Sequence, residues 1–288
     1  MDVYHQIIVR QQEWAKRRGI ILIGSAGERG EKNYTSTLSE NLFEPLSEAA
    51  KESFGHGNGN ETVGTPTHTA KMQALHSSSA LGVNVFHYWQ SNRQFGEIAA
   101  ACGFCKKVDC PTTEISFEGQ YKIEGIERIP PHLDIVFGNK TEAKYGCYAI
   151  ESKFTEPFSA RGHGGLKPAY LQDEVVWKPY PSLHRLALQL EPEDTVFKYL
   201  HAAQLIKHVL GLTSAFGKDR FKLLYLWYDV PGEESAAHKG EIENFISNAK
   251  EDGVELSALT YQELFQNLCR SAGVENKGYL DYLKDRYF

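Results

Sequence analysis

The sequence lacks several features that would place it in a membrane or outside the cell. It has no run of about 18 apolar residues, the length a membrane-spanning helix needs, so no span is expected. Residues 1–30 are polar and mixed in charge, without the apolar stretch and cleavage site of a signal peptide. Five cysteines, an odd number in a long chain, argue against a disulfide scaffold. These absences predict a cytoplasmic protein.

The chain also lacks the positive charge that marks many nucleic-acid-binding proteins, since its formal net charge is -6. This does not exclude a nuclease, because metal-binding nuclease sites concentrate carboxylates and phosphate contact needs only a local basic face. With 41% hydrophobic and 24% charged residues, the 288-residue chain can bury a sizeable core. We expect an N-terminal helical extension over residues 1–68, packed on a core over residues 69–288.

Hydrophobic periodicity divides the chain into helices and strands. It predicts helices at residues 1–20, 38–54, 69–86, 92–102, 195–210, 239–250 and 260–272. Asp194 is a candidate N-cap of the helix that Gly211 would end. Strand patterns cover residues 113–118, 133–137, 146–154 and 221–228, with a hairpin expected between the second and third. Residues 24–30 form a glycine-rich loop, but the Gly-Lys-Ser/Thr ending of a phosphate-binding loop is missing.

The two strands of the predicted hairpin carry charged residues within apolar sequences. Alternate residues of a strand face opposite sides, so Glu151 and Lys153 share one face and Ile150 lies on the other. In the preceding strand, Asp134 faces away from Ile135. If both apolar faces pack on the core, Asp134, Glu151 and Lys153 project to the same side.

Two carboxylates and an ammonium group on a partly buried surface need compensation, and a divalent cation provides it. Mg²⁺ binds a few carboxylates and keeps positions open for water and phosphate oxygens, and Mn²⁺ is the expected substitute. We expect Asp134 and Glu151 to hold the ion, the backbone carbonyl of Ser152 to complete its shell, and Lys153 to assist the attacking water or stabilise developing charge. The plainer alternative is a solvated strand edge that bears a Glu/Lys pair.

These residues resemble the paired motif of the PD-(D/E)XK nuclease superfamily. The resemblance rests on Pro131-His-Leu-Asp134 followed by Ile150-Glu-Ser-Lys153. More narrowly, His76-Ser-Ser-Ser-Ala-Leu-Gly-Val-Asn-Val-Phe86, Gln204-Leu-Ile-Lys-His208 and Leu223-Leu-Tyr-Leu-Trp-Tyr-Asp229 are similar to a bacterial group of restriction endonucleases. One departure is that His132 and Leu133 separate the proline from Asp134, whereas the superfamily motif has them adjacent.

The resemblance spans roughly residues 70–230 and implies a fold and an activity. The fold would be an α/β restriction-endonuclease-like core, with a mixed central sheet flanked by helices and an N-terminal helical extension. The activity would be Mg²⁺-dependent hydrolysis of DNA phosphodiester bonds, in restriction or phage defence. Two alternatives stay open: a structure-specific or RNA-directed nuclease, and a binding module that keeps the fold without chemistry. The substrate would be double-stranded DNA, and two symmetry-related sites in a homodimer would cut both strands.

Other residues are candidates for supporting roles. In the superfamily, the helix after the Glu-x-Lys strand often supplies a polar residue, which here is Gln204, with His208 a weaker candidate on the same face. Glu114 would add a carboxylate for a metal, whereas Glu118 is expected on an exposed edge. Ser77 opens a helix, where capping is the ordinary role and phosphate contact the sharper one.

The long segment over residues 159–190 and a group of cysteines complete the candidates. Basic residues interleaved with aromatics predict DNA contacts in that segment. Its candidate DNA-binding residues are Arg161, Lys167, Lys178 and Arg185. Cys102, Cys105 and Cys110 suggest a zinc knuckle, but a closed zinc site wants four ligands, so zinc is not favoured over buried free thiols.

Overall fold

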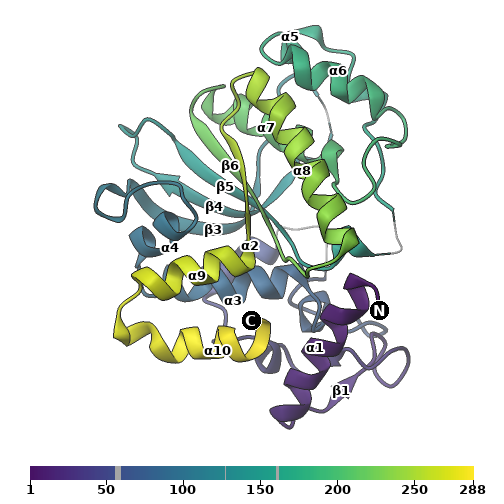
Figure 1. The fold of residues 1–288 in the computed structure, drawn as a ribbon, viewed down its shortest axis with the longest axis vertical. Helices are drawn as coiled ribbons and strands as arrows, with labels where there is room; N and C mark the ends of the chain where they lie inside the picture. Colours follow the sequence, from purple (N-terminus) through teal and green to yellow (C-terminus); the bar gives the residue numbers. More distant parts are fainter. Residues whose placement is uncertain (56–59, 127, 160–161) are drawn as a thin grey trace.

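The computed structural model describes residues 1–55, 60–126, 128–159 and 162–288. At its centre is a mixed sheet with the strand order β3-β4-β5-β6-β7 (Figure 1). The strands are β3 (Thr112–Gln120), β4 (His132–Asn139), β5 (Cys147–Lys153), β6 (Phe221–Trp227) and β7 (Leu256–Thr260). β3, β4 and β5 pair antiparallel, whereas β5, β6 and β7 pair parallel. The expected α/β fold with a mixed central sheet is confirmed.

Helices cover both faces of this sheet, and a small sheet of β1 (Leu22–Ile23) and β2 (Tyr34–Thr35) lies at the N-terminal end of the chain. The helices are α1 (Val3–Arg17), α2 (Glu48–Gly55), α3 (Ser78–Ser91), α4 (Phe95–Ala101), α5 (Glu174–Trp177), α6 (Pro181–Gln189), α7 (Ala202–Phe216), α8 (Glu233–Glu251), α9 (Tyr261–Ser271) and α10 (Lys277–Tyr287). α7 and α8 lie over one face, and α3 and α9 lie toward the other, with α10 and α1 beyond them (Figure 1).

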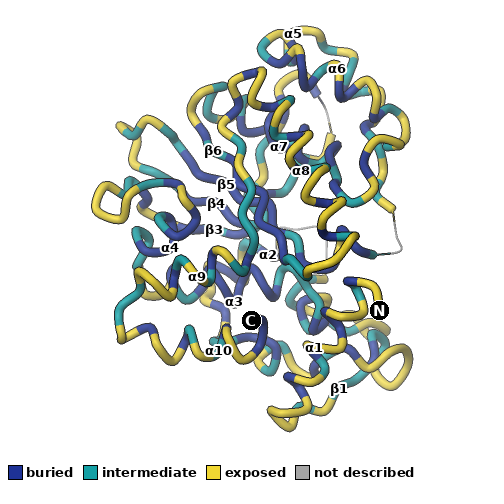
Figure 2. Tube along the Cα trace, in the orientation of Figure 1, coloured by how far each residue is buried: buried dark blue, intermediate teal, exposed yellow. Residues whose placement is uncertain are grey.

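The central strands are buried because helices cover both of their faces. β6 reads as a nearly continuous apolar run, as parallel strands with two covered faces do, and only Lys222 within it is partly exposed. On the α3 side, Phe86 meets Phe137 of β4 edge to face. Figure 2 shows the strands as a dark, buried centre surrounded by exposed helix surfaces. This rigid sheet fixes the positions of any polar side chains that point from it.

Two predicted helices in the first third of the chain were too long. Of residues 38–54, only a 3₁₀ turn (Leu38–Asn41) and α2 are helical, because Pro45 lacks the N–H that a continuous helix would need. Of residues 69–86, the first part is irregular, and α3 begins after Ser77, whose side chain accepts the N–H of Ala80. The ordinary capping role of Ser77 is therefore confirmed.

The helix predicted at residues 195–210 was placed too early. The Asp194 carboxylate accepts the N–H groups of Val196 and Phe197, so it caps a turn, and α7 begins only at residue 202. Gly211 lies inside α7, where it allows close contact: a Cβ there would lie 2.7 Å from the carbonyl oxygen of Tyr121. The helix ends instead at Gly217, with a φ of 93° that favours glycine.

Several elements gave no clear sequence signal. β7 is a short, half-exposed edge strand, and α5 and α6 interrupt the segment that seemed to lack periodicity. α10 packs against α1, where the buried Arg286 donates to the side chain of Gln11. In the described parts of the chain, no helix combines the length and the hydropathy needed to cross a membrane.

Candidate active site

β4 and β5 bring Asp134, Glu151 and Lys153 to one face of the sheet. Val136 of β4 pairs with Ala149 of β5 in an antiparallel register, so Asp134, two residues before Val136, and Glu151, two residues after Ala149, point to the same side. The N–H of Ser152 donates to the Asp134 carboxylate at 2.6 Å, which ties the two strands together here. Lys153 donates through Nζ to Oε1 of Glu151. The geometry thus places the three predicted side chains together, on the face that α7 covers.

Glu151 is the most enclosed member of this group, with 1% of its side chain exposed. Its second oxygen, Oε2, lies 2.7 Å from Nε2 of His208 on α7. Burial alone would raise the pKa of Glu151, but Lys153 and His208 outweigh burial and lower this pKa to about 2. Glu151 is therefore a carboxylate at neutral pH.

Lys153 is held by two neighbours. Besides Glu151, its Nζ donates to Oε1 of Gln204, one turn along α7 from His208, at 3.0 Å. Burial by itself would lower the pKa of Lys153, but Glu151, Asp134 and Glu156 together raise this pKa. Lys153 is therefore an ammonium ion at neutral pH, and Gln204 lies where the resemblance placed it.

Asp134 is the member whose charge is least compensated. Burial raises its pKa well above the ordinary range, and the nearby Glu151 charge raises it further, against the opposing effect of Lys153. A divalent cation between Asp134 and Glu151 would remove this repulsion, so the donor set fits such an ion. The side chain of Ser152 points to the opposite face and meets the Tyr261 hydroxyl at 2.6 Å. Only the backbone of Ser152 remains as a metal donor.

Glu118, expected on an exposed edge, lies close to these residues instead. It sits on β3 beside the start of β4, with 15% of its side chain exposed and His132 Nδ1 at 3.2 Å. The strand register places Glu118 opposite Asp134, between the pairs Phe117–Ile135 and Gly119–Leu133, so regular alternation turns it toward the face of Asp134. Burial raises the pKa of Glu118, and its charge in turn helps to raise the pKa of Asp134. It is the nearer of the two β3 glutamates to the site.

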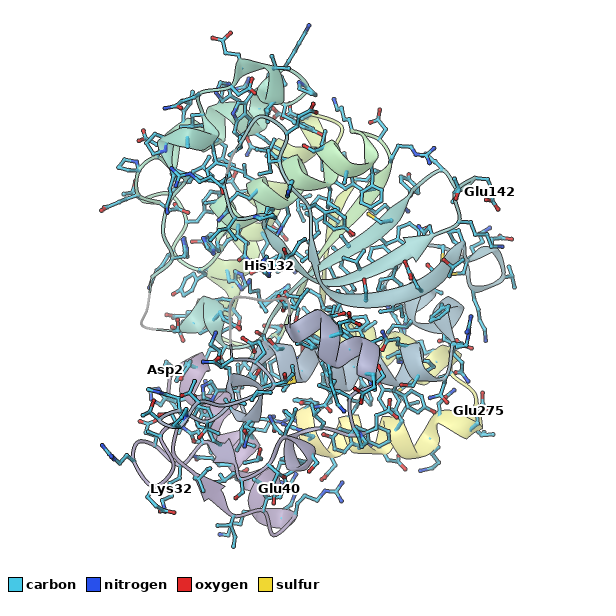
Figure 3. All side chains as sticks on the ribbon, turned by 180° about the vertical axis from the view of Figure 1, so that it is seen from behind. Asp2, Lys32, Glu40, His132, Glu142 and Glu275 are labelled. Atoms are coloured by element: carbon cyan, nitrogen blue, oxygen red, sulfur yellow. The ribbon has the colours of Figure 1, made fainter. Side chains whose placement is uncertain are left out.

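Glu114 lies elsewhere on the sheet. It pairs with Gly138, near the end of β4 that leads to the turn at Glu142, whereas Asp134 lies near the start of β4 at His132. Figure 3 shows His132 near the middle of the molecule and Glu142 at its edge. Four residues of extended strand separate Asp134 from Gly138, roughly 13 Å, so the structure does not bring Glu114 to the other carboxylates.

The first turns of α7 add basic groups next to Lys153. His201 precedes the helix and stacks on His163, with ring centroids 5.1 Å apart. Burial, together with Lys153 and His163, lowers the pKa of His201 to about 4. Burial also lowers the pKa of Lys207, and the charges of Lys153 and Lys167 lower it further. His163 belongs to the segment whose basic residues suggested DNA contact, but nothing in the sequence indicated that it stacks on His201.

Of the four predicted DNA-binding residues, the three that the structure describes do not form one surface. Lys167 is exposed and close enough to Lys207 to lower its pKa. Arg185 lies 3.5 Å from Glu251 at the end of α8, remote from the N-terminal turn of α7 that holds Gln204. Lys178 follows α5 near that same remote end (Figure 1), and Arg161 lies outside the described residues.

The cysteines are free thiols. Cys102 is buried, and Cys105 and Cys110 are partly buried. Burial raises the pKa of Cys105 to about 12, with Cys110 adding to the shift, so this thiol stays protonated at neutral pH. Across residues 1–55, 60–126, 128–159 and 162–288, no three His, Cys, Asp or Glu side chains are grouped as a metal site would require. At the trio, the acidic donors are Asp134 and Glu151, whereas the third predicted acidic donor, Glu114, lies elsewhere on the sheet.

Comparison with known proteins yields a family but no close relative. No curated protein and no solved structure matches the chain. A family model described as "Restriction Endonuclease associating with ARP" matches residues 8–288, nearly the whole sequence. The chain belongs to this restriction endonuclease family.

Proposed function

We propose that this protein is a Mg²⁺-dependent DNA endonuclease of the PD-(D/E)XK type, with Asp134, Glu151 and Lys153 as its catalytic group. One observation carries the proposal: two carboxylates and one ammonium group meet on the same face of adjacent strands, where they could hold a divalent cation next to a group that stabilises developing charge. The restriction endonuclease family supports the same class of reaction. Double-stranded DNA is the proposed substrate.

Asp134 and Glu151 would hold the Mg²⁺ ion, with Mn²⁺ as a substitute. When bound, the ion would polarise the scissile phosphate and lower the pKa of a water molecule. His208 holds Glu151 from the side opposite Lys153, so the carboxylate is oriented before any ion binds. Because burial and the charge of Glu151 raise the pKa of Asp134, a cation at this position would favour the charged form of Asp134.

Lys153 is suited to stabilise charge and not to accept a proton. Its pKa is raised, so it remains an ammonium ion at the pH at which the enzyme would work. Gln204 accepts one of its N–H groups and fixes the direction of the side chain. In a substrate complex, the same ammonium group would donate to a phosphate oxygen as negative charge develops there. We place Lys167 and Lys207 beside it as contacts to neighbouring phosphates.

The proposal is tested by plasmid cleavage with Lys153→Ala in the presence of Mg²⁺. We expect a loss of at least about 100-fold, since removing one charge-stabilising donor typically has that effect. Lys140→Ala is the matched control: Lys140 is exposed, in the turn after β4 at the far end of the same sheet. Full activity of Lys153→Ala, or an equal loss in Lys140→Ala, would contradict the assignment.

A role in restriction or phage defence, and a homodimer that cuts both strands, follow as further parts of the proposal. Sequencing the ends of the cleaved plasmid would show whether cuts fall at fixed sites on both strands. Sedimentation of the chain with a DNA duplex would show whether two copies bind. Cleavage of RNA but not DNA by the wild-type chain would favour the alternative of an RNA-directed nuclease.

A further inference from the structure

A large cavity opens next to the catalytic group, at the edge of the sheet where β5 ends. Its volume is about 980 Å³, at the upper end of the range for ligand pockets in proteins. Its walls come from the start of α1, from β2, from the start of α3, from the segment after β5 and from the segment before α7. Asp2, labelled in Figure 3, marks the α1 rim.

Aromatic rings line two sides of this cavity. On one side, the His76 ring meets Tyr4 and Tyr34 edge to face, with centroids 6.1 and 6.2 Å apart. On the other side, Phe158 and Tyr199 have centroids 6.1 Å apart. Aromatic side chains recover about 1–3 kcal/mol for each nucleic-acid base that stacks on them. The cavity therefore offers flat rings to a flat ligand.

Four carboxylates line the cavity, those of Asp2, Glu61, Glu156 and Glu234, against the two ammonium groups of Lys71 and Lys198. Asp2 is 2.7 Å from the ring of His5, and Glu61 is 3.4 Å from Lys71. Glu234 accepts the N–H of Val3. A surface that follows the DNA backbone would show an excess of cations, which this cavity does not have. Its chemistry suits an uncharged planar group better than a chain of phosphates.

The cavity also presents hydrogen-bonding groups. The hydroxyls of Ser78 and Ser79 line it at the first turn of α3. Nδ1 of His76 is buried, and within the described residues no hydrogen-bond partner reaches it. Burial lowers the pKa of His76, so the neutral ring can donate or accept. Hydroxyl and imidazole groups are well suited to the edge of a nucleobase.

The cavity adjoins the catalytic group closely enough to take part in the same complex. Thr155, which lines it, comes two residues after Lys153 and donates to the carbonyl oxygen of His76 at 3.3 Å. Thr155 lies in a bend after β5, and two residues span at most roughly 7 Å, the length of about two nucleotides of B-form DNA. Glu156 faces both parts: its charge raises the pKa of Lys153 and that of His76.

We propose that this cavity receives a single nucleobase, extruded from the DNA duplex within about two nucleotides of the scissile phosphate. The inference rests on the proposed nuclease function and specifies how that site engages its substrate. Extrusion costs a few kcal/mol of unpairing and unstacking, and stacking on the tyrosine rings offsets part of that cost. An enzyme built this way selects cleavage sites through the extruded base as well as through the groove.

The test is mismatch scanning around a cleavage position mapped from plasmid ends. Single mismatches are walked through the four nucleotides on each side of the cut, and binding is followed by fluorescence anisotropy in Ca²⁺ buffer. A mismatch lowers the cost of extrusion, so one position should bind at least about tenfold more tightly than the matched duplex. 2-Aminopurine at that same position should change its fluorescence on binding.

Variants show whether the cavity is responsible. Tyr34→Leu and Tyr199→Leu, one from each aromatic side, should each weaken binding to the mismatched duplex about fivefold or more, and Tyr34→Phe should retain it. Tyr145→Leu is the matched control, because Tyr145 lies at the opposite end of the sheet, before β5. Two variants guard against the failure of either one to fold, which melting curves would reveal.

The outcomes separate this inference from the function on which it rests. A cleaving enzyme that shows no mismatch preference and no 2-aminopurine signal overturns the base pocket and leaves the nuclease proposal standing. The same is true if the signal appears but neither leucine variant changes it. If no DNA is bound or cut, both proposals fail together.

Discussion

Two groups of buried charge in this molecule are built in opposite ways. Between α1 and α10, Arg286 is fully buried, and its donors reach Gln11, the Asn41 carbonyl and side chain, and the Tyr282 hydroxyl. Its guanidinium also lies 4.1 Å from the centroid of the Trp14 ring. Every one of these partners is neutral, so the charge is solvated by fixed dipoles and needs nothing further.

The charges of Asp134, Glu151 and Lys153 on β4 and β5 are not all compensated by their neighbours. Asp134 lies beside a second carboxylate and has a strongly raised pKa, whereas Glu151 is satisfied by Lys153 and His208. The contrast teaches how to tell a structural charge from a functional one. A structural charge is surrounded by complementary groups, and a functional one keeps a repulsion that a ligand would remove.

The largest effect should come from Asp134→Asn. We expect cleavage to fall by about 1,000-fold, because a carboxylate donor to the metal is lost. We also expect the melting temperature to rise, since the amide removes the repulsion with Glu151 and its oxygen can still accept the Ser152 N–H. Plasmid cleavage and calorimetry measure the two effects. A variant that loses stability would show that the Asp134 charge is compensated in the folded protein.

Arg286→Met should lower stability and leave cleavage unchanged. Removing a buried cation that satisfies several acceptors leaves those acceptors unpaired, and we expect a loss of about 3 kcal/mol in unfolding free energy. Urea denaturation measures this change. The cleavage rate per folded molecule should stay the same, because Arg286 lies in the α1–α10 layer. A lower rate at full folding would mean that this layer also shapes the catalytic group.

The contrast also explains what could be predicted from the sequence. The central strands and the trio were predictable because strand alternation is a local property, and apolar neighbours fix which face each side chain takes. Asp134, Glu151 and Lys153 meet for that reason. Glu118 was placed wrongly because strand alternation gives the face of a side chain but not its burial, which here depends on the pairing with β4 and on His132. The enclosure of Glu151 by His208 depends on how α7 packs, which spacing along one helix does not determine.

The ends of helices and the C-terminal helix α10 were less predictable, because they too depend on tertiary packing. A glycine often ends a helix, yet Gly211 lies inside α7, where it makes a close contact with the Tyr121 backbone. Arg286 gave no signal, because an arginine near the chain end usually lies at the surface. Its burial requires Gln11 and Asn41 to converge from distant parts of the sequence. Such convergence is a property of the assembled fold.

Mg²⁺ binding should have a smaller effect on stability, and this effect should distinguish the Asp134 site from the Arg286 site. At a concentration of 100 times Kd, a ligand that binds only the folded state adds about 2.7 kcal/mol to stability. We expect Mg²⁺ to raise the melting temperature of the wild type and of Arg286→Met, and to have little effect on Asp134→Asn. Na⁺ at matched ionic strength is the control. Equal stabilisation of all three proteins by Mg²⁺ would place the ion away from Asp134.

A last contrast concerns acid. His238 is fully buried on α8, and its ring forms a hydrogen bond of 3.0 Å with the Tyr225 hydroxyl. Tyr225 lies beside Glu151 on the sheet. Burial lowers the pKa of His238 from 6.5 to about 3. Between these values the unfolded chain binds the extra proton, so stability falls as pH falls below 6.5, by about 1.4 kcal/mol per pH unit.

His238→Gln isolates this contribution, because glutamine can still pair with the Tyr225 hydroxyl but binds no proton. The raised pKa values of Asp134 and Glu118 act in the opposite direction, since a folded carboxyl that binds its proton more readily stabilises the protein as pH falls. Those carboxyls are common to both proteins, so the difference in unfolding free energy between wild type and variant cancels their effect. That difference should change steadily between pH 6.5 and 4 in urea titrations. A difference that stays constant would mean that His238 is protonated in the folded state, and that the sheet face beside Glu151 is as well solvated as the surface.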